Sequence, residues 1–270
     1  MTRILAIANQ KGGVGKTTTS VNLAASLAYY NRRVLLVDLD PQGNATMGSG
    51  INKQLCDYTT YHFLTKRESI GKVISSSAHC NYHVVPSNGD LVAAEVELMQ
   101  APEREQRLAK CLNQVSASYD YIIIDCPPSL NMLTVNALVA GDGVLIPMQC
   151  EYFALEGLSA LNHTIRKISR DINPRLRIEG ILRTMYDPRS SLTNAVSAQL
   201  RKYFDDKLYR VSIPRNVRLA EAPSHGKPAL AYDKNSKGAT AYLALAAEIL
   251  KNERQNQIVS EETEAYQHGH

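Results

Sequence analysis

The residues best suited to chemistry lie in the segment 9–18, which reads Asn-Gln-Lys-Gly-Gly-Val-Gly-Lys-Thr-Thr. Glycines allow successive backbone N–H groups to turn toward a single anion. In such a loop Lys16 would reach the β- and γ-phosphates of a nucleotide, and the Thr17 hydroxyl would bind magnesium. Lys11 adds a second positive charge that an ordinary phosphate loop does not need. The segment predicts a nucleotide and Mg²⁺ site with one extra lysine.

The flanking elements suit this loop. An apolar run at residues 4–8 precedes it, and residues 21–27 after it have the spacing of a helix. Strand, glycine loop and helix together form a phosphate cradle, with the anion at the helix N-terminus. The general pattern G-x-x-x-x-G-K-[ST] has a glycine where this chain has Gln10, so the match is imperfect at its first position.

Two acidic segments follow other apolar runs. Asp38 ends the run 34–38, and Asp40 lies in the Pro- and Gly-containing loop after it. Spacing alone leaves two roles open for Asp40, which could orient the water that attacks a γ-phosphate or could cap backbone N–H groups of a turn. Asp125 ends the run 121–124, which predicts an acid held by a stiff strand near magnesium and acting through water. The prolines after it end the strand and shape a second loop.

The elements that must position these residues alternate along the chain. Strands are expected at residues 4–8, 33–38, 82–86, 121–125, 143–147, 178–182 and 208–213, and helices at 104–115, 155–169 and 192–204. Apolar runs without alternation indicate strands buried on both faces, hence a parallel sheet. This pattern predicts an α/β fold, a doubly wound, mostly parallel sheet with helices on both faces. We expect one domain over residues 1–252 and a polar, disordered tail over 253–270.

Composition bounds the class of protein. The chain has 270 residues, 44% of them hydrophobic, and no run of about 18 apolar residues, so no membrane span is expected. A first strand at Arg3 leaves no room for a signal peptide. The five cysteines lack C-x-x-C spacing, which argues against a disulfide framework or a metal site and favours a cytoplasmic protein.

Positive charge is concentrated in one part of the chain. Residues 1–150 carry 12 Lys/Arg and 12 Asp/Glu, whereas residues 151–254 carry 18 and 11, and residues 255–270 carry none and 3. A neutral nucleotide-binding half beside a half of net +7 suggests a second, anionic partner. Charge alone equally allows an ordinary solvated surface.

Five motifs occur in the order found in the ParA/MinD family of deviant P-loop ATPases. They are K-G-G-V-G-K-T-T, V-D-L-D-P-Q-G-N-A-T, I-I-D-C-P-P-S-L, Q-C-E-Y-F-A-L-E-G-L and I-P-R-N-V-R-L-A-E-A-P-S. Over residues 3–250 the chain most closely resembles the chromosomal, Soj-type partition ATPases of this family. The resemblance implies ATP and Mg²⁺ as ligands, and nucleotide contacts from Lys11, Gly12, Gly13, Val14, Gly15, Lys16, Thr17 and Thr18. It also implies that Lys11 crosses a dimer interface to the partner's nucleotide, that Asp40 is needed for hydrolysis, and that Pro214 and Asn216 contact adenine.

The same resemblance implies a function beyond hydrolysis. Soj-type proteins are ATP-dependent homodimers that bind DNA non-specifically on the nucleoid and segregate chromosomes or plasmids with a ParB-type partner. It implies slow basal turnover that the partner stimulates. Arg189 and Arg218 match DNA-contacting positions of the type, and Lys202, Arg201 and Lys234 are weaker candidates. No sequence-reading motif precedes the first strand, so operator recognition is not expected.

Three alternatives remain at this point. A MinD-like ATPase bound to membranes would share the loop and both acids, but it should end in a basic amphipathic helix, whereas residues 255–264 are acidic. An electron-transfer protein like the nitrogenase iron protein needs cluster cysteines, and neither Cys126 nor Cys150 lies in that motif. A small-molecule ligase or kinase on the same sheet would need a carved substrate pocket.

Overall fold

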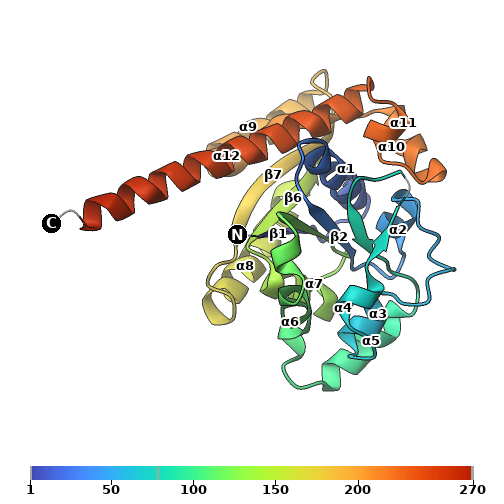
Figure 1. Ribbon diagram of the computed structural model, residues 1–270. Coiled ribbons are helices and arrows are strands. Elements are labelled where there is room, and N and C mark those ends of the chain that lie inside the picture. The colour runs from blue at the N-terminus through green and yellow to red at the C-terminus, as the bar shows by residue number, and fades with distance from the viewer. Residues whose placement is uncertain (1, 78, 269–270) are drawn as a thin grey trace.

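One sheet of eight strands forms the centre of the molecule (Figure 1). A computed structural model describes residues 2–77 and 79–268. The strand order is β3-β4-β2-β5-β1-β6-β7-β8, and every pairing is parallel except that of β3 with β4. The strands are β1 (Arg3–Ile7), β2 (Val34–Asp38), β3 (Ser75–Ser76), β4 (His83–Val85), β5 (Tyr121–Asp125), β6 (Gly143–Gln149), β7 (Arg177–Tyr186) and β8 (Leu208–Pro214).

Helices connect the strands and cover the sheet. They are α1 (Lys16–Tyr29), α2 (Asn44–Gly48), α3 (Thr60–Leu64), α4 (Ile70–Val73), α5 (Leu91–Gln100), α6 (Arg107–Asn113), α7 (Met132–Ala140), α8 (Ala154–Asp171), α9 (Ser191–Phe204), α10 (Val217–Glu221), α11 (Ala229–Tyr232) and α12 (Lys237–His268). Four short 3₁₀ turns complete the described part, η1 (Arg104–Gln106), η2 (Ser116–Ser118), η3 (Asp205–Lys207) and η4 (Ala222–His225).

The sheet has a hydrophobic core on each face. In β1, Ile4 and Ala6 join one cluster with side chains of α7 and α8, whereas Leu5 and Ile7 join the other with side chains of α1 and α12. Strands buried on both faces need no polar side, which is why β1, β2 and β5 are almost wholly apolar. This arrangement confirms the predicted doubly wound, mostly parallel α/β fold.

The register of the central strands decides where the polar residues meet. Ile7 at the end of β1 pairs with Asp125 at the end of β5, and Asp125 in turn pairs with Asp38 at the end of β2. The loop after β1 and the two acids therefore leave the sheet side by side at its carboxyl edge, where ligands bind in open α/β sheets.

The C-terminal segment belongs to the last helix. Helix α12 continues to His268 and extends well past the sheet in Figure 1, so it includes most of the tail that was predicted over residues 253–270, of which residues 269–270 lie outside the described part of the chain. The sequence explains this, because residues 253–268 contain neither Gly nor Pro and are rich in Glu, Gln and other good helix formers. The missing apolar periodicity had suggested disorder, but a helix that has formed upstream can be extended through residues that do not pack.

β3 and α5 are among the elements that were not predicted from the sequence. Strand β3 has only two residues, Ser75 and Ser76, and pairs antiparallel at the sheet edge. Helix α5 has apolar residues on its exposed side, Val92, Val96 and Met99. Its apolar residues are therefore not confined to one face, and its sequence lacks a clear amphipathic helical pattern. Among the described residues, no helix combines the length and the apolar character that a bilayer span requires.

Candidate nucleotide site

The glycine loop between β1 and α1 has the backbone conformation of a phosphate cradle. Gly13 and Gly15 have φ of 72° and 86°, in the left-handed region that disfavours residues with a Cβ. Gly15 is the residue before the first turn of α1, so the free N–H groups of that helix face the loop. Thr184 from β7 fixes the loop from outside by donating its hydroxyl to the carbonyl of Val14 at 2.8 Å.

Lys16 is a buried cation with no anionic partner inside the described part of the chain. Its side chain is 7% exposed, and its ammonium donates to the carbonyl of Lys11 at 3.1 Å. Burial lowers the pKa of Lys16, while the nearby Asp125 opposes this shift. A buried ammonium directed into a glycine loop suits an anionic phosphate, which would offset the desolvation of the charge.

Asp125 receives two hydroxyl groups from α1. Thr17 donates to its Oδ2 at 2.8 Å and Ser20 donates to its Oδ1 at 2.7 Å. Burial, followed by the charge of Asp38, raises the pKa of Asp125 to about 8. Two acids this deeply buried need a counter-charge, and hydroxyl and carboxylate oxygens are the ligands that Mg²⁺ takes, often through water. Thr17 and Asp125 therefore fit a hydrated magnesium ion beside the loop.

Asp38 and Asp40 have different surroundings although they are two residues apart. Asp38 is fully buried and accepts hydrogen bonds from the backbone and the hydroxyl of Thr46 at 2.8 and 2.7 Å, which fastens α2 to the strand end. Burial raises the pKa of Asp38 to about 6. Asp40 is 8% exposed, lines the loop cavity and accepts from the N–H of Gln42 at 2.9 Å. Asp38 thus fixes α2 to the end of β2, whereas Asp40 has one carboxylate oxygen, Oδ2, that is available to a ligand.

Lys11 points away from its own loop. Its ammonium forms an ion pair with Glu151, and both side chains are about half exposed. Its backbone N–H donates to Asn9 Oδ1 at 3.0 Å, and Asn9 is in turn fixed by a bond to the carbonyl of Pro147 at 2.7 Å. The Lys11 side chain is therefore an exposed cation on a backbone held in place by Asn9, and Lys11 is not among the described residues that line the loop cavity.

The loop borders a cavity of about 390 Å³. Its lining comes from the carboxyl edge of the sheet and comprises Gly12, Gly13, Gly15, Lys16, Thr17, Thr18, Asp40, Gln42, Asn44, Pro128 and Met185. Neither Pro214 nor Asn216 is among the residues that line this cavity or the adjoining one over Thr18, Asn22 and Pro223. Pro214 ends β8 at the same sheet edge, and the Asn216 side chain caps α10 by accepting from the N–H of Arg218 at 3.1 Å. Their contact with adenine stays a prediction.

Comparison with known proteins agrees with this geometry. Residues 2–178 match the family described as an AAA domain. The chain is 54% identical to the sporulation initiation inhibitor protein Soj of Bacillus subtilis over 93% of this chain and 100% of that protein. It is 53% identical to the chromosome partitioning protein ParA of Myxococcus xanthus over 93% of this chain and 89% of that one. The chain belongs to the ParA family.

A solved structure supports the same fold for this ParA-family chain. The cobyrinic acid a,c-diamide synthase of Mycobacterium smegmatis, crystallised with ADP and magnesium, aligns with a TM-score of 0.83 and 34% identity. The alignment covers 95% of this chain and 97% of that one. The ParA-family sheet is thus shared with a protein named for a different reaction, so the fold does not by itself choose the chemistry.

The predicted DNA-contacting residues of the ParA-family chain do not all lie together. Arg189 and Arg218 follow β7 and β8 at the carboxyl edge of the sheet, because Tyr186 pairs with Pro214 just before them. Arg189 is paired with Asp187 at 2.8 Å, and Arg218 with Glu221 at 2.7 Å. Lys202 lies near the other end of α9, about 17 Å along the helix from its start. Arg189 and Arg218 form one candidate surface, and Lys202 stands apart from it.

Several residues of the site were not found from the sequence. Ser20 could have been, because it lies three residues after Thr17 and so shares a helix face with it. Met185 and Thr184 come from β7, distant in sequence, and no local pattern marks them. The pairing of Glu151 with Lys11 likewise depends on the fold alone.

Proposed function

We propose that this ParA-family chain is an ATPase whose ATP-bound form dimerises, binds DNA without sequence preference and segregates a chromosome or plasmid with a ParB-type partner. The observation that carries the proposal is the buried Lys16 ammonium beside the Thr17–Asp125 hydrogen bond, at the mouth of a glycine loop. In this arrangement the Lys16 ammonium would bind the phosphates, and the oxygens of Thr17 and Asp125 would hold the magnesium ion.

The residues divide the work of hydrolysis. Lys16 and the loop N–H groups would hold the β- and γ-phosphates, and Thr17 would bind Mg²⁺ with Asp125 behind a water molecule. Magnesium would neutralise charge on the phosphates. Asp40, with one oxygen held by the Gln42 N–H, would orient the attacking water with the other. We propose that turnover is slow without the ParB-type partner and that this partner accelerates it.

Dimerisation is supported by two features of the loop. Lys11 is an exposed cation on a fixed stem, with its nearest anion in an exposed pair that costs little to break. Gly12 is not among the residues with positive φ, and a Cβ built on it would meet no atom within 4 Å, so nothing in the described part of the chain requires glycine there. If the same loop of a second subunit approached face to face, it would explain both the exposed lysine at position 11 and the glycine at position 12.

DNA binding is supported by the charge distribution. Residues 151–254 contain 18 of the 30 Lys and Arg residues, and they include the Arg189 and Arg218 surface. Both arginines are paired with acids on exposed positions, so phosphate oxygens would compete with carboxylates for them. Such contacts release counterions, and the affinity should fall steeply with salt. A dimer doubles this surface, which would couple DNA binding to ATP and place the protein on the nucleoid in the cytoplasm.

DNA binding measured against salt, with ADP, ATP and a non-hydrolysable ATP analogue, tests the proposal. We expect binding only with ATP or its analogue, and loss of binding for Arg218→Glu while the analogue still produces a dimer. Arg67→Glu, which changes an exposed, paired arginine in the turn between α3 and α4, is the matched control. Binding that is equal in all nucleotide states would refute the switch, and lipid-vesicle binding that depends on ATP would favour a MinD-like role instead.

A further inference from the structure

A buried serine from a distant segment of the chain holds the backbone of Asp40. Ser87 lies two residues after the end of β4 and has no exposed surface. Its hydroxyl donates to the carbonyl oxygen of Asp40 at 2.8 Å. Asp40 is the acid proposed to orient the attacking water. The hydrogen bond therefore joins the loop after β4 to the residue on which the proposed hydrolysis depends.

The other hydrogen bonds that Asp40 accepts come from its own turn. Its carbonyl accepts from the N–H of Gly43 at 2.9 Å, and its Oδ1 accepts from the N–H of Gln42 at 2.9 Å. Both bonds join residues of one short segment, so they give the turn its shape without fixing its place in the protein. Among the described residues, Ser87 is the one donor to Asp40 from outside residues 38–43.

The backbone of Ser87 holds the same two loops together. Its N–H donates to Oγ1 of Thr46 at 2.9 Å, and Thr46 in turn donates its hydroxyl to Asp38 at 2.7 Å. The loops also approach closely, because a Cβ built on Gly43 would lie 2.5 Å from the carbonyl oxygen of Ser87. The backbone contacts fix where Ser87 lies, and its hydroxyl passes that position on to Asp40.

We infer that Ser87 is a positioning residue for ATP hydrolysis, whose hydroxyl fixes the turn that carries Asp40 and so keeps the Asp40 carboxylate in the loop cavity. The inference rests on the proposed role of Asp40. Without the hydroxyl the turn could shift as a unit, and a displacement of about 1 Å can slow a reaction about a hundredfold. Lys16 and Thr17 would still hold the phosphates and Mg²⁺, because they belong to the segment after β1.

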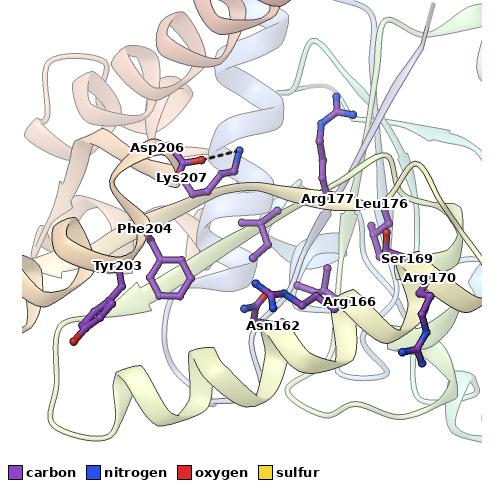
Figure 2. Close-up of a pocket in the computed structure, with 12 residues that line it drawn as sticks. Asn162, Arg166, Ser169, Arg170, Leu176, Arg177, Tyr203, Phe204, Asp206 and Lys207 are labelled. Atoms are coloured by element: carbon purple, nitrogen blue, oxygen red, sulfur yellow. Dashed lines mark ion pairs between the residues drawn. The ribbon is translucent and has the colours of Figure 1, made fainter.

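Ser87→Ala should therefore separate nucleotide binding from hydrolysis. We expect kcat to fall about tenfold, while the affinity for a non-hydrolysable ATP analogue, measured by calorimetry, stays within about twofold of the wild type. Ser169→Ala is the matched control. Ser169 lines a cavity with Arg177, the first residue of β7, at the amino edge of the sheet (Figure 2). Asp40 follows the carboxyl end of β2, so the control should leave both quantities unchanged.

A double-variant cycle distinguishes positioning from a general structural role. A residue that acts through Asp40 has nothing left to position in Asp40→Ala. The Ser87→Ala/Asp40→Ala variant should therefore turn over at the rate of Asp40→Ala alone. If Ser87 affected hydrolysis through general stability instead, the two losses would multiply.

Hydrogen exchange of the Gln42 and Gly43 amides tests the same contact without hydrolysis. Both N–H groups donate to Asp40, so their exchange reports how firmly its turn is held. Ser87→Ala should speed this exchange about tenfold, whereas Ser169→Ala should not change it. The measurement needs no nucleotide and uses the full chain.

Three results would overturn the inference, namely wild-type kcat in Ser87→Ala, losses that multiply in the double variant, and unchanged exchange of the two amides. An impaired Asp40→Ala beside an unimpaired Ser87→Ala would refute the inference alone. Wild-type turnover of Asp40→Ala would refute the proposed role of Asp40 and the inference with it.

Discussion

Lys11→Ala should abolish ATP-dependent dimerisation without destabilising the subunit. Within the described residues the Lys11 side chain is paired with Glu151, and both side chains are about half exposed. Such a pair is worth about 0.2–1 kcal/mol, so the free energy of unfolding should change by less than about 1 kcal/mol.

The effect on the dimer should be far greater if Lys11 contacts the partner's nucleotide. A hydrogen bond to a charged group contributes about 1.5–3 kcal/mol, and a two-fold dimer contains two such contacts. Their loss corresponds to about 3–6 kcal/mol, or a dimer dissociation constant weaker by about a hundred- to ten-thousandfold. Sedimentation velocity with a non-hydrolysable ATP analogue over a range of protein concentrations measures this constant directly.

Glu151→Gln is the matched variant, because it changes the same ion pair from the other side. It frees Lys11 from its exposed partner, so the dimer should become tighter by about two- to thirtyfold, the equivalent of two pairs of about 0.2–1 kcal/mol. Opposite shifts for the two variants cannot come from the loss of a common contact. A dissociation constant for Lys11→Ala within about threefold of the wild type would refute the crossing-lysine argument.

Three further predictions concern the loop and the sheet. Gly12→Ala should leave the stability of the subunit within about 0.5 kcal/mol, because its Cβ meets nothing within 4 Å, yet it should impair dimerisation in the same sedimentation assay. Asp40→Ala should bind ATP, measured by calorimetry, but lower its hydrolysis at least about tenfold and accumulate dimer; wild-type turnover would remove the water-orienting role. Gly180→Ala should lower the free energy of unfolding in urea by about 1–3 kcal/mol, because its Cβ would lie 2.4 Å from the Tyr209 ring, whereas Gly157→Ala, with open space on α8, should not destabilise the protein.

The sequence by itself determined the fold class and the centre of the candidate site. Apolar runs of strand length without alternation can be satisfied only when both faces are covered, which predicts the doubly wound sheet. Two local patterns mark the centre of the site: glycines before Lys16 and Thr17, and an acid at the end of each of two apolar runs. Each pattern can be recognised within a short segment, because it depends only on neighbouring residues. The continuous helix to His268 was not anticipated, although the absence of Gly and Pro from residues 253–268 was visible.

Only the tertiary structure decided which residues surround that centre. The strand order β2-β5-β1 brings Asp38, Asp125 and the loop to one level, and no spacing in the sequence specifies that order. The pair of Lys11 with Glu151 joins residues 140 positions apart. Local patterns reflect what a short segment requires for itself, whereas contacts between distant segments are set by the packing of the whole sheet.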